Sequence, residues 1–526
     1  MNLLNEEDGG FMHVVQLKLN TTKYDKQEID KRFHAVTHIH NVLVKHAKKL
    51  LHQLDVNKEY LSLKQEYMVI LKKEKLSSED NKRKKELALQ MNAIRKDMGL
   101  SEYAFQSYIK VCAKQFNKML SSQQVQKEAT RVWKGVEKIL FSNGKDIHFK
   151  KYIDFDTIGG KSNKNGVRFH KDTFSIEWAG LEIKCRMPKK DSDYDYVMES
   201  LAGNISYCEL KRMMFPNGWH YYVLVYVKGD SPKKSSSGSG KDMEYRTMGI
   251  DSGVSTVAAV SENKVMLEEL APCCMKYNKK IIKLQKRIDK SKKISNPENY
   301  NLDDTVKKGR KKWKFSNTYF KMRQRLKSLY RQKSAYMKTS HGNLCNRLLK
   351  ESIYFVTEDM NFKGLQKKSR QPAERQEKVS EVKQKDGTVK EVKKFKRKKR
   401  FGKSLNNRSP GLFMQMLRQK AEDYGGMVVT VNMKKFKASQ YNHQTGECIK
   451  KKLSDRWNEL YDENGNGIKV QRDLYSAFLL SNADNKLWFP DRDKCIYGFH
   501  KFVKMHDEVI GDMKNNKVSM KQCFGF

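Results

Sequence analysis

The sequence predicts a two-lobed protein, with a helical domain and a β-barrel in one lobe and an α/β domain carrying a helical hairpin in the other. Three observations lead to this fold class. The chain has 526 residues, too many for one compact domain. Its hydrophobic period changes from two to 3.6 and back within the first 228 residues. Residues 229–242 (GDSPKKSSSGSGKD) cannot pack a core and are expected to link the lobes.

The first lobe is expected to be a barrel that contains a helical insertion. Residues 12–19 alternate like a half-buried strand, and apolar residues from Ile29 to Leu50 then follow helical spacing. A charged stretch at 58–98 continues the helical block, and Ser121 with Gln124 forms a capping box at the start of another helix. The period of two then returns. The expected domains are a barrel at 1–20 and 144–228, with strands at 173–178, 181–186, 204–213 and 219–228, and a helical domain at 21–143.

The second lobe shows the alternation of strands and helices that is typical of an α/β core. Buried strands are expected within 246–260 and at 353–357, and two long basic helical stretches lie between them, around 275–289 and 320–338. A helix is expected from Leu412 to the Gly425-Gly426 pair, followed by a strand at 427–431. This core is expected to comprise residues 243–433 and 469–526.

Charge restricts the class of partner. The chain has 106 Lys and Arg residues and 61 Asp and Glu residues, a formal net charge of +45. Such an excess indicates a polyanionic partner, and nucleic acid is the leading candidate. Hydrophobic residues make up 38% of the chain, which excludes global disorder.

Cysteine usage and apolar run length indicate the compartment. The nine cysteines include no C-x-x-C pair, as expected of reduced thiols in a cytoplasmic protein. No apolar stretch approaches the ~20 residues of a membrane span. We therefore expect a cytoplasmic protein without a membrane partner.

Three acidic residues stand where a metal site could form from distant segments. Asp251 lies on a hydrophobic strand, Glu358 closes another strand, and Asp473 begins an amphipathic segment at 474–487. Carboxylates at such positions suit Mg²⁺, which prefers oxygen ligands, and two such ions can drive phosphodiester hydrolysis. Spacing alone leaves the alternative open that each acid is a solvated or capping carboxylate, because the chain has 61 acids.

The sequence around the three acids resembles a known set of nuclease motifs. GIDSG, TEDMNFKGL and QRDLYSAF resemble the three RuvC motifs of the transposon-encoded TnpB proteins and of their descendants, the compact type V CRISPR effectors. The usual Asp-x-Asn-Ala-Ala of the third motif is replaced by Asp473, Leu474, Tyr475, Ser476 and Ala477. The resemblance covers most of the chain. It implies a ribonuclease-H-like (RuvC) nuclease lobe and a second lobe made of a wedge barrel and a helical recognition domain.

The resemblance also implies the catalytic residues. Asp251, Glu358 and Asp473 would be the metal-binding catalytic acids, and Glu358 is preferred to Asp359 because the motif places its Glu first. Asp484 is an alternative for the third acid. If one helix carried both Asp473 and Asp484, they would be about 16 Å apart and could not serve one metal pair.

The family often has a zinc ribbon before the third motif, and here its ligands are missing. Asn442 and Thr445 occupy the places of the first cysteine pair, and no cysteine lies between Cys448 and Asp473. One cysteine and His443 cannot form the four-ligand site of structural zinc. We therefore expect a zinc-free, degenerate ribbon-like domain for target nucleic acid at 434–468, with a hairpin turn at 462–467 and packing by Leu453, Trp457, Leu460 and Tyr461.

Two basic segments are candidates for nucleic-acid contacts. Residues 393–403 contain eight Lys or Arg residues, and this run is either a solvated loop or a flexible phosphate-binding arm formed by Lys396, Arg397, Lys398, Lys399 and Arg400. Basic and aromatic residues also interleave from Trp313 to Tyr319, a mixture that suits phosphates and bases but is also common in cores.

The resemblance implies an RNA-guided DNA endonuclease. Its partners would be a guide RNA and target double-stranded DNA, and it would act as a monomer or as a homodimer on one guide RNA. A single RuvC site with two Mg²⁺ or Mn²⁺ ions would cut beside a short duplex motif read by the protein. Two alternatives are an unguided nuclease or resolvase on the same core and a catalytically silent RNA-guided binder. The sequence leaves open whether the guide comes from a CRISPR array or a transposon end.

Overall fold

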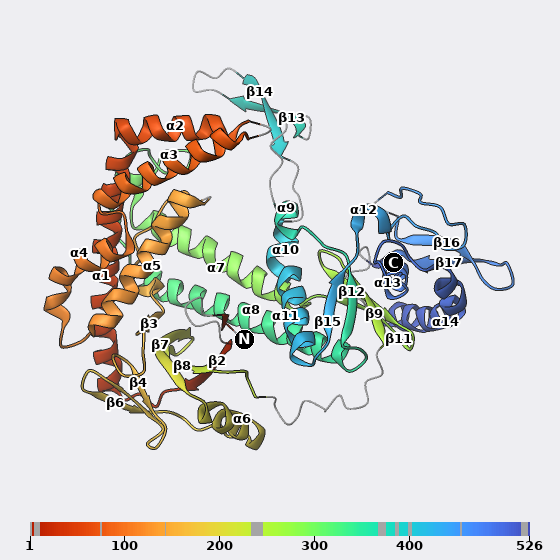
Figure 1. Ribbon diagram of the computed structural model, residues 1–526, viewed down its shortest axis with the longest axis horizontal. Coiled ribbons are helices and arrows are strands. Elements are labelled where there is room, and N and C mark those ends of the chain that lie inside the picture. The colour runs from red at the N-terminus through yellow and green to blue at the C-terminus, as the bar shows by residue number, and fades with distance from the viewer. Residues whose placement is uncertain are drawn as a thin grey trace. The chain divides into compact units, whose positions relative to one another are not determined.

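The computed structural model divides the chain into two compact units, Met1–Gly238 and Ser239–Phe526 (Figure 1). Their boundary falls in the segment predicted to link the lobes. The residues that the structure describes are 3–4, 11–73, 76–142, 144–232, 246–366, 375–383, 389–397, 402–452, 455–516 and 524–525. Among them, no helix combines the length and the apolar character that a membrane crossing requires.

The helical part of the first unit confirms the helices expected from the apolar period. The charged stretch at 58–98 forms two helices, and a further helix, α4, was not expected. Thr22, Ser77 and Ser121 each cap a helix through a reciprocal capping box, which satisfies backbone N–H groups that have no partner inside the helix. The helices are α1 (Lys23–Asp55), α2 (Lys58–Leu71), α3 (Ser78–Asp97), α4 (Glu102–Ala113) and α5 (Ser122–Phe141).

The strands of the first unit form two antiparallel sheets. A five-stranded sheet has the order β1-β2-β8-β7-β3, and a three-stranded sheet has the order β4-β5-β6. A β-bridge between Leu19 and Cys185 joins them, and a closed barrel remains a prediction. The elements are β1 (Leu3–Leu4), β2 (Phe11–Lys18), β3 (Thr157–Gly159), β4 (Arg168–His170), β5 (Ser175–Trp178), β6 (Leu181–Lys184), α6 (Asp191–Ala202), β7 (Ile205–Phe215) and β8 (Gly218–Lys228).

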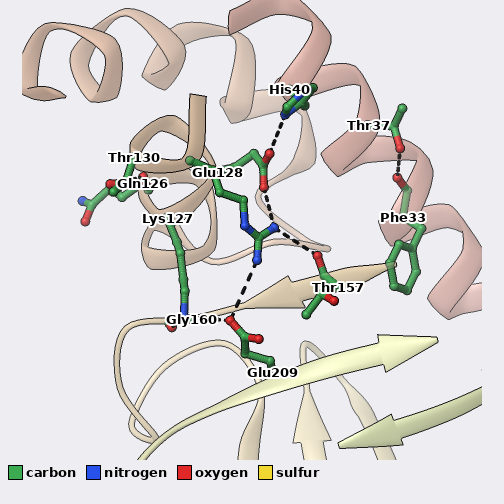
Figure 2. A network of polar contacts seen from close by, with 11 residues as sticks. Phe33, Thr37, His40, Gln126, Lys127, Glu128, Thr130, Thr157, Gly160 and Glu209 are labelled. Carbon is green, nitrogen blue, oxygen red and sulfur yellow. Dashed lines mark hydrogen bonds and ion pairs between the residues drawn. The ribbon is translucent and has the colours of Figure 1, made fainter. Parts of the chain in front are cut away.

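A polar network attaches the helical insertion to the five-stranded sheet (Figure 2). Glu128 on α5 is buried and lies 2.6 Å from Nδ1 of His40 on α1. Arg131 donates to Glu128 at 2.9 Å and to the backbone oxygen of Thr157 on β3 at 3.1 Å. It also lies 3.8 Å from Glu209 on β7. Because a buried carboxylate is costly without partners, these contacts specify how α5 lies on the sheet.

The second unit is built on one five-stranded sheet with the order β11-β10-β9-β12-β15. β10 is antiparallel to both of its neighbours, whereas β9, β12 and β15 are parallel. Successive side chains of β12 pack into two different hydrophobic cores. Val356 packs with α13 and α14, and Phe355 packs with α8 and α11. The bounds are β9 (Thr247–Ser252), β10 (Thr256–Ser261), β11 (Lys264–Glu269), β12 (Tyr354–Thr357), α11 (Pro410–Asp423), β15 (Met427–Thr430), α13 (Arg472–Ser481) and α14 (Arg492–Asn515).

Three insertions extend from this core. A helical hairpin between β11 and β12 has its own small hydrophobic core, as the sequence predicts for an attached hairpin. The basic run at 393–403, expected to be a loop or a flexible arm, begins within strand β14, which pairs antiparallel with β13. The inserted and connecting elements are α7 (Cys274–Ile294), α8 (Asn317–Leu349), α9 (Phe362–Gln366), β13 (Arg375–Lys383), β14 (Val389–Arg397), α10 (Gly402–Arg408) and α12 (Met433–Phe436).

The third insertion is the ribbon-like region before α13. Its strands β16 (Trp457–Tyr461) and β17 (Gly467–Gln471) pair as a hairpin, and Asp462 accepts backbone hydrogen bonds from Asn464 and Asn466 in the turn, which confirms the predicted turn. Leu460 is buried as expected. The packing role of Tyr461 was wrong, because its side chain is 62% exposed on the outer face of the hairpin. Leu453 lies outside the described residues.

Candidate active site

The sheet register brings Asp251 and Glu358 to one edge. β9 and β12 are parallel, and Ile250 lies opposite Thr357. The residues that follow these two in the chain, Asp251 and Glu358, are two of the predicted acids. Neighbouring strands are about 4.8 Å apart, so the two backbone positions are adjacent at the carboxyl ends of the strands.

Asp473 reaches the same region from a helix. It lies in the first turn of α13, whose N-cap residue Gln471 accepts a hydrogen bond from the backbone N–H of Leu474 at 2.8 Å. α13 packs directly on β9 at Gly249, where an added Cβ would lie 2.0 Å from the backbone oxygen of Ala477. The close approach that glycine permits therefore places the N-terminus of α13 near the edge that carries Asp251.

Electrostatics indicate that the charges of the other two acids act on Asp251. The pKa of Asp251 is raised well above its ordinary value, first by desolvation and then by the negative charges of Asp473 and Glu358. Burial also raises the pKa of Glu358. Like charges that disfavour ionisation in this way are typical of functional sites that need a cation.

Two arginines lie beside the third acid. Arg472 is 3.3 Å from one carboxylate oxygen of Asp473, and Arg456 is 3.7 Å from the other. Both guanidinium groups act on Asp251 in the opposite direction to its acidic neighbours and lower its pKa. The site therefore combines three acids with two cations that partly neutralise them.

The donor set fits a divalent cation, although the side chains are not arranged as a metal shell. Three carboxylates offer only oxygen ligands, as Mg²⁺ and Mn²⁺ prefer. Across the described part of the chain, no three His, Cys, Asp or Glu side chains lie close enough together to form a metal-binding group. Asp473 is engaged by its arginine partners instead.

Asp484, the alternative third acid, lies elsewhere. α13 ends at Ser481, so Asp484 follows the helix, and its carboxylate accepts a hydrogen bond from the backbone N–H of Trp488 at 2.7 Å. It lines a pocket with Thr247 and Tyr354, the first residues of β9 and β12. Asp251 is four residues further along β9, roughly 13 Å away along the strand, which separates Asp484 from the other acids.

The predicted basic arm is only partly described. Lys396 and Arg397 are the last residues of β14, and their backbones pair with Gln376 and Arg375. Lys398, Lys399 and Arg400 lie outside the described residues. The first part of the basic run therefore belongs to a strand, because residues 389–397 find a pairing partner in residues 375–383.

Hydrogen bonds organise the turn at the missing zinc ligands. The Tyr475 hydroxyl accepts from the backbone N–H of His443 at 3.0 Å and lies 2.7 Å from Nδ1 of the same residue. Desolvation, with the charge of Arg492 as a smaller cause, lowers the pKa of His443 to about 4. The neutral ring can therefore accept the hydroxyl proton. Arg492 donates to the backbone oxygens of His443 at 2.9 Å and Gln444 at 2.6 Å.

Sequence reasoning missed the residues that surround the acids. Arg456 and His506 lie outside the three motifs. Arg472 lies within the third motif, which gives it no specific role. His506 on α14 is 1% exposed, and its Nε2 accepts a hydrogen bond from the backbone N–H of Gln471 at 3.0 Å. Only the arginine directly before Asp473 could have been noted, from its place in QRDLYSAF.

Comparisons with known proteins add little to this geometry. No family model and no curated protein matches the chain. One matching solved structure is a cryo-EM structure of a CRISPR-Cas12f ternary complex, with 12% sequence identity and a TM-score of 0.25. The match covers 87% of this chain and 82% of that chain. A TM-score this low supports no conclusion about fold or activity. Such conclusions rest on the residues of this chain.

Proposed function

We propose that this protein is an RNA-guided DNA endonuclease with a single RuvC-like hydrolytic site formed by Asp251, Glu358 and Asp473. The observation that carries the proposal is that the register of β9 and β12 brings Asp251 and Glu358 to one edge, where desolvation and then the charges of Asp473 and Glu358 raise the pKa of Asp251. The motif resemblance supports the RuvC assignment, and the charge of +45 supports nucleic-acid partners.

The three acids would hold the ions of this site. Divalent cations bound there would activate a water molecule and stabilise the leaving oxygen of a phosphodiester. Asp251 and Glu358 are held by adjacent parallel strands, so the sheet keeps their backbones at a constant separation. Asp473 would turn from Arg456 and Arg472 to the ions, which would leave both arginines to attract the phosphate.

The guided character of the reaction is the second part of the proposal. Guide RNA would read the target strand by base pairing, and protein contacts would act on the backbone. Binding would therefore depend on dispersed cations, whereas cleavage would depend on three carboxylates.

Isosteric variants separate these two requirements. We expect Asp251→Asn, Glu358→Gln and Asp473→Asn each to reduce Mg²⁺-dependent cleavage to background while guided target binding stays near that of the unmodified protein. Combined variants should lose no more activity, because ligands of one metal cluster fail as a unit. The assay uses RNA sequenced from the purified complex as the guide and compares Mg²⁺ with EDTA.

Asp484→Asn is the matched control, because it removes a carboxylate of the same unit that lies away from the three acids, and it should cut normally. Cutting by Asp473→Asn together with inactivity of Asp484→Asn would show that the third acid is misassigned. Cutting by all three primary variants would refute the RuvC-like site. Cutting of duplex DNA by RNA-free protein would favour the unguided nuclease.

A further inference from the structure

The α7–α8 hairpin carries a large share of the charge of the molecule. Residues 274–349 contain 23 Lys and Arg residues against four Asp and Glu residues, a net charge of +19 in 76 of the 526 positions. The hairpin has its own core of Ile281, Leu284, Ile288, Tyr319 and Leu326. The proposed hydrolytic site uses none of these cations.

Two asparagines shape the connection between the two helices. The side-chain amide of Asn296 is fully buried and donates to the backbone oxygens of Lys292 at 2.8 Å and Lys314 at 2.7 Å. Its Oδ1 accepts from the backbone N–H of Lys314 at 2.6 Å. Asn299 donates to the backbone oxygen of Lys312 at 2.7 Å. Residues 312–314 are therefore held by side chains, although they belong to no sheet.

Residues 310–315, which include the segment held in this way, alternate between exposed and half-buried. The half-buried ones use their side chains within the protein: Lys311 donates to the backbone oxygen of Lys308 at 2.7 Å, and the Trp313 ring lies 3.6 Å from Nζ of Lys292. Phe315 stacks on Tyr319 with ring centroids 4.4 Å apart. The other set, Arg310, Lys312 and Lys314, is exposed and cationic, and so is the neighbouring Lys308.

Three of these cations, Arg310, Lys312 and Lys314, share one face, whereas Lys308 precedes a bend at Gly309, whose φ is +92°. In an extended segment every second side chain points to the same side, with a repeat of roughly 6.6 Å. Across the described residues, the four side chains make no hydrogen bond or ion pair with the protein, so their charges are available to a ligand. The repeat is comparable to the distance between successive phosphates of a nucleic-acid strand.

We propose that Arg310, Lys312 and Lys314, together with the neighbouring Lys308, form a prearranged cationic strand that binds the sugar–phosphate backbone of a nucleic acid without reading its bases. Lysine and arginine side chains bind phosphate through charge-assisted hydrogen bonds. The clamps of Asn296 and Asn299 order the segment before binding, which reduces the entropy that binding would otherwise cost. Guide RNA and target DNA share this chemistry, and the test distinguishes them.

The test compares two variants with the same loss of charge. The first, K308Q/R310Q/K312Q/K314Q, removes the proposed strand. The control, K72Q/K184Q/K264Q/K504Q, removes four exposed lysines that are scattered over both units. Full-length protein freed of nucleic acid is titrated in EDTA with labelled single-stranded RNA, an RNA duplex and a DNA duplex, at salt concentrations between about 0.05 and 0.2 M.

We expect the first variant to bind at least one probe roughly tenfold more weakly and to lose about 2.8 from the slope of log K against log[salt] for a single strand, or about 3.6 for DNA duplex. The control should change much less. A loss with the RNA probes alone identifies the guide as the ligand, and a loss with the DNA duplex alone identifies the target. Equal slopes in the two variants for every probe would overturn the proposal.

Asn296→Ala tests the arrangement separately, because it keeps every cation. We expect weaker binding of the same probe with an unchanged salt slope. Unchanged affinity in a folded variant would overturn the claim that the clamp matters. If circular dichroism shows that this variant is unfolded, the comparison of the two fourfold variants decides the proposal. The titrations use EDTA and measure no cleavage, so their outcome is independent of the hydrolytic site.

Discussion

At the scale of single residues, the proposed active site contains a carboxyl group, that of Asp251, whose ionisation is unfavourable. Asp251 has a raised pKa because it is shielded from water and faces Asp473 and Glu358. A carboxyl group with a raised pKa in the folded state makes folding less favourable once it is ionised. Natural proteins often accept such a cost at functional sites, where the stabilising ligand is a cation.

Removal of this charge should stabilise the metal-free protein. We expect Asp251→Asn to raise the thermal stability in EDTA at neutral pH, by on the order of 1 kcal/mol. The gain should vanish below the ordinary pKa of 3.8, where Asp251 is protonated in both states, grow as the pH rises from 3.8 toward the raised pKa, and stay constant above it. Thermal unfolding across pH measures it. A variant less stable than the unmodified protein at neutral pH would contradict this account.

His506 is the second residue with an expected effect, because it contacts the N-cap of the helix that carries Asp473. Its Nε2 accepts the backbone N–H of the N-cap residue Gln471, and its Nδ1 lies 2.8 Å from Asp507. His506→Ala leaves that buried N–H without an acceptor and loosens the start of α13. We expect the Mg²⁺ concentration for half-maximal cleavage to rise by about tenfold.

Two further variants test this positioning role. His506→Gln, which can offer an acceptor oxygen near Nε2, should recover part of the Mg²⁺ affinity. Asp507→Asn changes only the exposed partner and should have a small effect. An unchanged Mg²⁺ dependence in His506→Ala would leave His506 with a role in folding alone.

At the scale of elements, the contact between β9 and α13 sets how near Asp473 lies to Asp251. An added methyl group at Gly249 would lie 2.0 Å from the backbone oxygen of Ala477, and backbone atoms cannot move as a side chain can. We expect Gly249→Ala to reduce the free energy of unfolding by about 3 kcal/mol or more and to abolish cleavage. Chemical denaturation and the guided cleavage assay measure the two effects.

Gly342→Ala is the matched control on α8. There the nearest atom to an added Cβ is Cε of Met416 at 3.6 Å, an ordinary contact. Because glycine weakens a helix interior, this variant should gain about 0.5–1 kcal/mol. Equal stability of the two alanine variants would show that β9 and α13 do not need their close approach.

At the scale of the whole molecule, the net charge of +45 dominates. Charge repulsion within the free protein is relieved by a polyanion, and the release of counterions makes binding steeply dependent on salt. We expect protein purified at low salt to carry RNA and to lose it as the salt concentration rises. Absorbance ratios and sequencing of the bound RNA check this expectation. Protein free of nucleic acid at low salt would contradict the guided function.

Local patterns in the sequence predict most of the elements. Periods of two and 3.6 identify β2, β7, β8, α1 and α5, because each of these elements buries one face and its apolar residues repeat accordingly. The strands β13 and β14 are missed, since their sequences are dominated by charged residues and show no apolar period. The Asp386-Gly387 dipeptide between them is the hairpin signal that was available in the sequence.

The sequence by itself predicted the three acids and a polyanionic partner and determined that cysteine pairs for a zinc ribbon are absent, because motifs, charge and ligand chemistry are properties of residue types. The tertiary structure alone decided which acids lie together. The register of β9 and β12 brings Asp251 beside Glu358, and the helix end at Ser481 separates Asp484 from them. The pairing of Asp473 with Arg456 likewise joins segments that local patterns cannot relate. Such contacts depend on long-range packing, which has no signature in the period or composition of a short segment.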